Sequence, residues 1–246
     1  MKQPTLKFFL PALLLGGMIL FISMKTTPTV APDAELGSIS GKITYDGSVP
    51  KLNPIQMNKA CSALHDGDVQ NQSLVLGDGN ALANVFIHIK NAPQTRQPVP
   101  TTPVDMTITG CLYTPRVVGV QVGQPLNFKN SDGILHNVHG LPKVNREFNI
   151  GMPPNLKEKE VTFNKPEPVF KVKCDVHPWM TGYVAVMTHP YFAVTDETGH
   201  FRIPNLPDGT YEIEAWHEKL PKVTKTVVVQ RGSATVDIAF KPPRKK

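Results

Sequence analysis

Apolar and polar residues alternate with a period of two along several short segments of the chain. The pattern is clearest in SISGKITY (38–45), ANVFIHIK (83–90), VDMTITG (104–110) and VGVQVGQPLNFKN (118–130). It resumes after residue 182 in short segments separated by turn-forming sequences such as DETG and PDG. Side chains of a β-strand point alternately to opposite faces, whereas no stretch keeps the 3.6-residue period of an amphipathic helix. The pattern therefore predicts an all-β protein built from sandwich strands.

Three stretches depart from this pattern. Residues 46–80 show little periodicity, and residues 140–167, rich in Pro, Asn and Lys, are expected to form a long loop with no more than one short strand. Residues 8–22 are an uncharged apolar run, short for a membrane span of about 20 residues but suited to the core of a signal peptide. We therefore expect a periplasmic or otherwise extracytoplasmic protein, with residues 1–34 either cleaved as a signal peptide or retained as an N-terminal anchor.

The net charge of +6 comes from the two ends of the chain. Residues 1–34 hold three lysines and residues 241–246 hold four cationic side chains, and without these seven charges the body carries −1. Nucleic-acid binding needs a basic face on the folded domain, so no nucleic-acid partner is expected. The basic tail is interpreted as a solvated end, with attraction to anionic lipid or an acidic partner as the alternative.

Soft and borderline metal donors occur at two places that follow predicted strands. His136 comes shortly after a strand expected to end at Asn130. Cys174, His177 and Met180 lie within seven residues, directly after a second predicted strand. One thiolate, two imidazoles and a weak axial thioether are the donors of a copper electron-transfer site. The spacing therefore predicts a mononuclear copper site made of these four residues.

The stretch from about Val104 to Met187 resembles a cupredoxin, most closely the amicyanin and plastocyanin type. The resemblance is carried by YTPRVVGVQVGQPLNFKNSDGILHNVH and by the short ligand loop CDVHPWM. It implies a Greek-key β-sandwich in which the four donors above bind copper. It also implies that the side chain of Asn137 ties the two ligand-bearing loops together.

Two features near the predicted ligands have more than one interpretation. His139 is interpreted as a wall residue that supports the site from outside, with direct metal ligation as the alternative. The long stretch that follows it could cover the site or bring Glu147 near it. Of the three cysteines, Cys61 and Cys111 are expected to form a disulfide that leaves Cys174 as the thiolate, while a disulfide between Cys174 and either of them stays open.

The flanking segments resemble a carboxypeptidase regulatory-like (transthyretin-type) β-sandwich. GSISGKITYDGSVP and LANVFIHIKN match its first strands, but the hairpin that should follow, TDETGHFRIPNLPDGTY, comes only after the copper motif. The simplest interpretation is a discontinuous sandwich, residues 35–97 plus 191–240, with the cupredoxin of residues 98–190 inserted between its second and third strands. Three separate modules in a row are the alternative. Insertion predicts that Ile89 and Phe192 are neighbours in space.

Two classes of function fit these features. The first is a periplasmic carrier of single electrons whose partner is a cytochrome or a dehydrogenase, with the ring edge of His177 as the exit path and Pro178 and Trp179 as an apolar docking patch. The second is a module that binds or buffers copper, or serves the cell envelope structurally, without a redox partner. No catalytic acid, base or open-site pattern surrounds the donors, so we do not expect an enzyme. A catalytic copper site with an open position, with Met180 distant and His139 or Glu147 near the metal, is a minor alternative.

Overall fold

The computed structural model describes residues 36–94 and 97–243. The predicted leader at residues 1–34 and the last three residues of the basic tail lie outside the described residues. Within the described part of the chain, no helix has the length and apolarity needed to cross a membrane.

Strands account for nearly all of the regular structure. The only helical segments in the described residues are α1 (Lys59–Ser62) and the short 3₁₀ turn η1 (Asp78–Asn80). The predicted all-β class is therefore confirmed. The strands are β1 (Gly37–Tyr45), β2 (Phe86–Ile89), β3 (Val104–Thr109), β4 (Leu112–Thr114), β5 (Val117–Gln121), β6 (Pro125–Asn130), β7 (His136–Leu141), β8 (Phe148–Met152), β9 (Glu158–Thr162), β10 (Glu167–Lys173), β11 (Thr181–Met187), β12 (Phe192–Val194), β13 (His200–Leu206), β14 (Gly209–Trp216), β15 (Val223–Val229), β16 (Ser233–Thr235) and β17 (Ile238–Phe240).

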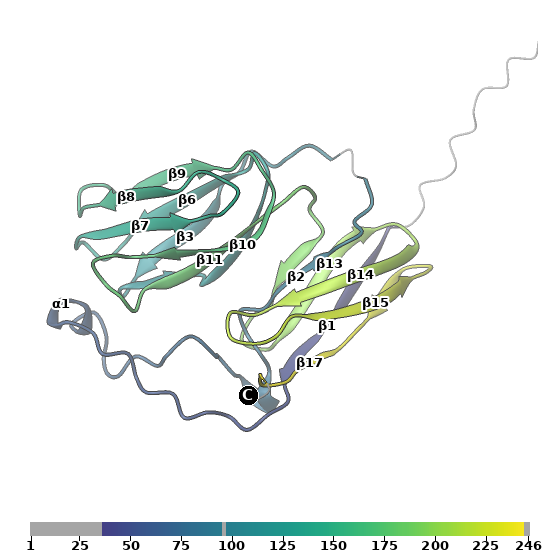
Figure 1. The fold of residues 1–246 in the computed structure, drawn as a ribbon, viewed down its shortest axis with the longest axis horizontal. Coiled ribbons are helices and arrows are strands. Elements are labelled where there is room, and N and C mark those ends of the chain that lie inside the picture. Colours follow the sequence, from purple (N-terminus) through teal and green to yellow (C-terminus); the bar gives the residue numbers. More distant parts are fainter. Residues whose placement is uncertain (1–35, 95–96, 244–246) are drawn as a thin grey trace, which may run out of the picture. The chain divides into compact units, whose positions relative to one another are not determined.

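These strands form four sheets around two main cores (Figure 1). The sheets β13-β1-β16, with β17 also on β1, and β12-β2-β14-β15 enclose a core that contains Ile43 and Ile213. The sheets β5-β11-β10-β7-β8 and β4-β3-β6-β9 enclose a core that contains Phe128 and Val172. The inward-facing residues of the alternating segments supply both cores, as the period of two predicts.

The first of these sandwiches is discontinuous in sequence. β1 pairs with β13, and β2 pairs with β12 and β14, so strands from both ends of the described chain share sheets. Phe192 pairs with His88, and the Ile89 N–H donates to the Tyr191 carbonyl at 3.1 Å. The expected proximity of Ile89 and Phe192 is therefore confirmed. The domain boundaries at residues 97/98 and 190/191 stay a prediction, because pairing does not show which part folds alone.

Residues 140–167 contain more strand than their composition indicates. β7 continues to Leu141, and both β8 and β9 lie in this stretch. The expectation of a long loop with no more than one short strand is wrong. β8 and β9 are the outer strands of their sheets, and β9, of sequence EKEVT, is almost wholly exposed. An outer strand with solvent on one face needs few apolar residues, so its sequence lacks the alternation that marks an inner strand.

Residues 46–80 carry little regular structure, as expected, but they are tied to the second sandwich. Cys61, the one buried residue of α1, forms a disulfide with Cys111 in the turn between β3 and β4. The Asn58 side chain caps α1 by accepting a hydrogen bond from the Cys61 N–H at 2.9 Å. The chain from β1 to β2 therefore reaches the hairpin that carries Cys111.

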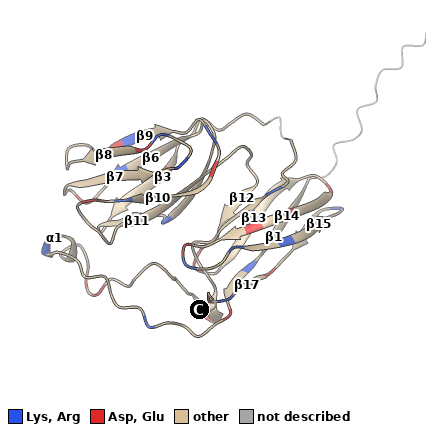
Figure 2. Cartoon of the chain, viewed as in Figure 1, with Lys and Arg blue, Asp and Glu red and all other residues tan. Residues whose placement is uncertain are grey.

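Positive and negative side chains are interspersed along the described chain (Figure 2). Several form local pairs: Lys129 with Asp105 at 2.7 Å, and Lys222 with Glu214 at 2.6 Å. The fold therefore mixes both signs of charge, and the basic balance comes from the ends of the sequence.

Candidate metal centre

The four predicted ligands come from two segments at one end of the second sandwich. His136 is the first residue of β7, and Cys174, His177 and Met180 lie in the loop between β10 and β11. β7 and β10 are antiparallel neighbours in one sheet. In an antiparallel pair, the start of one strand lies beside the end of the other, so the topology brings His136 to this loop.

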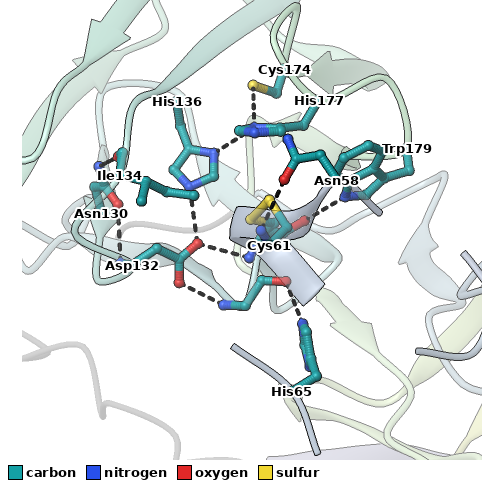
Figure 3. Close-up of a disulfide and its surroundings, with 12 residues drawn as sticks. Asn58, Cys61, His65, Asn130, Asp132, Ile134, His136, Cys174, His177 and Trp179 are labelled. Atoms are coloured by element: carbon teal, nitrogen blue, oxygen red, sulfur yellow. Dashed lines mark hydrogen bonds and ion pairs between the residues drawn. A yellow bond between two sulfur atoms is a disulfide. The ribbon is translucent and has the colours of Figure 1, made fainter. Parts of the chain in front are cut away.

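Three of the four donors converge in a buried cluster. His136 Nδ1 lies 3.0 Å from His177 Nδ1, and Cys174 Sγ lies 3.7 Å from the same nitrogen (Figure 3). The ligand atoms of these three residues lie within 4.8 Å of one another. Met180 is fully buried in the same core cluster, and its carbonyl accepts a hydrogen bond from the Cys174 N–H at 3.3 Å. The loop therefore closes on itself around these donors.

Asn137 links the two segments, as the cupredoxin resemblance implies. Its Oδ1 accepts hydrogen bonds from the Asp175 N–H at 2.7 Å and from the Cys174 thiol at 3.2 Å. Its own backbone N–H points at Cys174 Sγ from 3.5 Å. These contacts fix the sulfur relative to β7, which carries His136.

Asp132 is a site residue that the sequence patterns did not reveal. Its side chain is 3 % exposed, and its Oδ2 lies 3.0 Å from His136 Nε2. The same carboxylate accepts hydrogen bonds from the backbone N–H groups of Gly110 at 2.6 Å and Cys111 at 2.8 Å. A carboxylate can only accept, so His136 carries a proton on Nε2, and Nδ1 is the ring nitrogen that faces the other ligand atoms. The sequence signal for this role was an aspartate four residues before a candidate ligand, but the tripeptide SDG is also typical of a turn.

The electrostatics of the cluster favour a thiolate. Burial alone would raise the pKa of Cys174, but hydrogen bonds from His136 and from backbone N–H groups, that of Asn137 among them, outweigh it and lower the pKa. Burial likewise opposes charge on His136, but the Asp132 carboxylate and the Cys174 sulfur raise its pKa. The pKa of His177 is lowered by burial and then by the charge of His136. A lowered thiol pKa is what a metal-binding cysteine needs.

The Asp132 carboxylate is held in its charged form. Burial would raise its pKa, but the hydrogen bonds from His136, Cys111 and Gly110 lower it below its ordinary value. Since this anion faces Nε2 of His136, it increases the electron density that the ring can offer through Nδ1.

His139 lies outside the cluster. It follows His136 by three positions along β7, so the two side chains point to opposite faces of the strand. Its ring lies 2.9 Å from Asp175 Oδ2 on one side and 2.9 Å from Glu147 Oε1 on the other. Hydrogen bonding to Glu147 and then to Asp175 raises the pKa of His139. The long stretch after β7 therefore brings Glu147 to His139 and not to the buried donors.

His177 is covered, whereas the sequence led us to expect its ring edge beside an exposed docking patch. Its side chain is only 3 % exposed, and its ring centroid lies 5.2 Å from that of Trp179. Trp179 is half-buried and donates its indole N–H to the Cys111 carbonyl at 3.2 Å, whereas Pro178 is exposed. Figure 3 shows the Cys61–Cys111 disulfide beside the ring of His177. Cys174 is the free thiol among the three cysteines.

Comparisons with known proteins match parts of the chain. A family model described as polysaccharide lyase family 4, domain II, matches residues 181–236. That range begins in β11 and runs through β16, so it covers the later strands of the discontinuous sandwich. No curated protein matches the chain.

Several solved structures match part of the chain. A purple cupredoxin from Nitrosopumilus maritimus is 25 % identical over 33 % of this chain and 97 % of its own, with a TM-score of 0.28. Amicyanin from Paracoccus versutus is 23 % identical over 41 % of this chain and 96 % of its own, with a TM-score of 0.31. A copper-containing nitrite reductase from Thermus scotoductus is 22 % identical over 40 % of this chain and 25 % of its own, with a TM-score of 0.29. These scores are low, and the donor residues themselves support the function proposed next.

Proposed function

We propose that the chain binds one copper ion through His136, Cys174, His177 and Met180 and transfers single electrons outside the cytoplasm. The observation that carries this proposal is the convergence of a free, buried thiol and two imidazole Nδ1 atoms at the end of one sandwich. The matching cupredoxins and the apolar run at residues 8–22 agree with such a protein, placed in the periplasm or held to the membrane by its N-terminus.

The donor set fits copper. A thiolate, two imidazoles and a buried thioether suit copper, which accepts soft sulfur and borderline nitrogen ligands together. The lowered pKa of Cys174 makes the thiolate available, and Asp132 fixes His136 with Nδ1 turned towards the cluster. Harder cations prefer sets of carboxylates, whereas the Asp132 carboxylate beside His136 accepts hydrogen bonds from the Gly110 and Cys111 N–H groups.

The residues around the donors would keep one geometry in both oxidation states. Copper supplies one-electron chemistry by cycling between Cu(I) and Cu(II). The backbone N–H of Asn137 can donate to the thiolate of Cys174, and Asp132 holds the ring of His136, so neither ligand can easily rotate away. Fixed ligands limit the rearrangement that accompanies each electron, which is the requirement for fast transfer between protein partners, such as a cytochrome or a dehydrogenase.

The test is a spectrum of the copper-loaded full-length protein. An intense thiolate-to-copper absorption band should bleach with ascorbate and return with an oxidant. Cys174→Ser should abolish the band, because neither disulfide-bonded cysteine can supply that sulfur. His200→Ala, which removes an exposed imidazole on β13, is the matched control and should leave the band unchanged. A copper-loaded protein without any reversible band would refute the proposal.

A copper-holding module without a redox partner is the second candidate, and the covered position of His177 favours it. Electron exchange is fastest through a ligand edge that reaches the surface, and this ring lies under Trp179 and beside the disulfide. A modest chelator should remove copper within minutes from a buffering protein and far more slowly from a carrier. The two groups considered for an enzymatic site, His139 and Glu147, contact each other rather than the buried donors.

A further inference from the structure

We propose that reduction of the Cys61–Cys111 disulfide creates a second metal site, in which both thiolates and the imidazole of His177 bind one soft or borderline d¹⁰ cation such as Zn(II) or Cu(I). This inference goes beyond the copper site of the proposed function, because its two sulfur donors are not those of that site.

The donors are already gathered in the oxidised protein. Both disulfide sulfur atoms and one ring nitrogen of His177 lie within 4.8 Å of one another, and all three residues are buried. Figure 3 shows the sulfur pair between α1 and the ring of His177. Two thiolates and an imidazole are a common ligand set for Zn(II), and thiolates also select Cu(I).

A fourth donor lies close by. One carboxylate oxygen of Asp132, the sulfur of Cys111 and a nitrogen of His136 also lie within 4.8 Å of one another. A carboxylate oxygen has two lone pairs, so Asp132 could complete a four-coordinate site while it still accepts a hydrogen bond.

The second set shares only His177 with the copper site. Its Nδ1 faces His136 and Cys174. A neutral imidazole has one nitrogen lone pair, so the ring would bind the second ion when it is not bound to copper, or would bridge both ions as an imidazolate after losing its remaining proton. Cys174 lies outside the second set, and neither Cys61 nor Cys111 is among the copper donors. The two sites can therefore be separated by mutation.

The protein can accommodate the change in sulfur spacing. Two thiolates on one ion lie further apart than two bonded sulfurs, so one cysteine has to shift. Cys61 is free to do so, because α1 has four residues and Cys61 is its only buried one. Apart from the disulfide, the residues on either side of α1 are held by a contact of His65 Nε2 with the Gly110 carbonyl at 2.8 Å and by packing of half-buried Met57. Cys111 stays in its hairpin, where Asp132 binds its N–H.

The chemistry requires a two-electron reductant and then an ion. A dithiol gives two electrons and two protons to the disulfide, so that the sulfur–sulfur bond becomes two thiols while the dithiol forms its own disulfide. A phosphine gives the same two thiols with one water, which supplies the two protons and leaves its oxygen on the phosphine oxide. Binding of the ion then releases the thiol protons. Bonded sulfurs offer no thiolate, so the disulfide and the second ion exclude each other.

The experiment uses the full chain with Cys174→Ala, which removes the thiolate of the copper site. Zn(II) binding is measured for the oxidised protein and for protein reduced with a phosphine that is then removed under nitrogen. We expect the reduced form to bind one Zn(II) per chain more than the oxidised form, and the ion to slow alkylation of both thiols at least 10-fold. Co(II), as a spectroscopic probe, should give a thiolate-to-cobalt band in the reduced form alone.

Matched variants separate this site from adventitious binding. Adding Cys61→Ser to Cys174→Ala should abolish the extra equivalent, and adding His177→Ala should weaken binding at least 10-fold. Adding His65→Ala, which removes the other polar anchor of the segment, should leave the stoichiometry unchanged. Equal Zn(II) binding by reduced and oxidised protein, or unprotected thiols, would overturn the proposal.

The result of this zinc experiment does not depend on whether the copper proposal is right, because the copper proposal is tested on oxidised protein with Cys174 intact. If reduction alone abolishes the β-sheet circular dichroism, recovery of the signal on adding Zn(II) supports the second site, because the ion then replaces the covalent link. Failure to recover overturns it.

Discussion

Asp132→Asn tests how far a buried carboxylate controls the candidate metal centre. The wild-type side chain accepts three hydrogen bonds, from His136 Nε2 and from the N–H groups of Gly110 and Cys111. An asparagine has nearly the same shape but one acceptor oxygen and an amino group that only donates. At least one of the three donors must therefore face another donor.

The expected cost follows from these contacts. A hydrogen bond to a charged group contributes about 1.5–3 kcal/mol, and one such bond is lost while the others weaken, so the metal-free protein should lose about 2–4 kcal/mol of unfolding free energy. The carboxylate also makes the His136 ring a stronger donor. Loss of such an outer partner lowers metal affinity about 10–100-fold, or about 1.4–2.8 kcal/mol. The reduction potential should rise, because a nearby anion stabilises Cu(II) more than Cu(I).

Three measurements check this prediction: urea unfolding of the metal-free protein, competition with a chelator for Cu(I) and Cu(II), and the reduction potential. Asp105→Asn is the charge-matched control, since it removes a half-exposed carboxylate paired with Lys129 on the surface. If Asp132→Asn changed copper affinity no more than Asp105→Asn did, the carboxylate would have no role in holding His136.

Three further predictions concern other parts of the molecule. Met180→Leu should keep copper and raise its reduction potential, because a donor that favours Cu(II) is removed; complete loss of copper in a metal assay would contradict the axial role. Burial would raise the pKa of Glu167, but hydrogen bonds from the backbone N–H groups of residues 143–145 outweigh it and lower the pKa below 4.5. The charged side chain therefore stabilises the fold above pH 4.5, and this stability is lost as the pH falls through the pKa of the folded state. Glu167→Gln should therefore destabilise the protein by about 1–3 kcal/mol at pH 7 and far less in strong acid, and equal losses at pH 7 and pH 3 in urea titrations would contradict this. Residues 100–190 with Cys111→Ser should fold and bind copper alone, whereas residues 35–97 should show no cooperative unfolding by circular dichroism, since β1 and β2 belong to different sheets.

Local spacing made the donors of the candidate site predictable. Cys174, His177 and Met180 lie within seven residues, and the alternating strands on either side showed where the loop begins and ends. His136 could be added because a recognisable strand precedes it. Strand β9 was not predicted, because the sequence of an exposed outer strand does not alternate between apolar and polar residues.

Long-range contacts were harder to foresee. Asp132 lies in a sequence that also predicts a turn, and only the fold shows that Gly110 and Cys111 aim their N–H groups at it. Cys61, whose disulfide with Cys111 lies beside His177, comes from residues 46–80, which have no periodicity, and sequence alone allows three pairings among three cysteines. Position in space, rather than residue type, decides what these groups do.

The discontinuous sandwich also sets the order in which the protein can assemble. Gly37 at the start of β1 pairs with Leu206 at the end of β13, and β1 also pairs with β16 and β17, so the first strand has no partner strand until most of the chain is present. Strands β3 to β11 pair among themselves and close shorter loops, which cost less entropy and form faster. The sandwich that carries the candidate metal centre should thus reach its native form while the strands around it are still extended. Its compact shape would then bring Ile89 and Phe192 together and act as the template on which the outer sandwich closes.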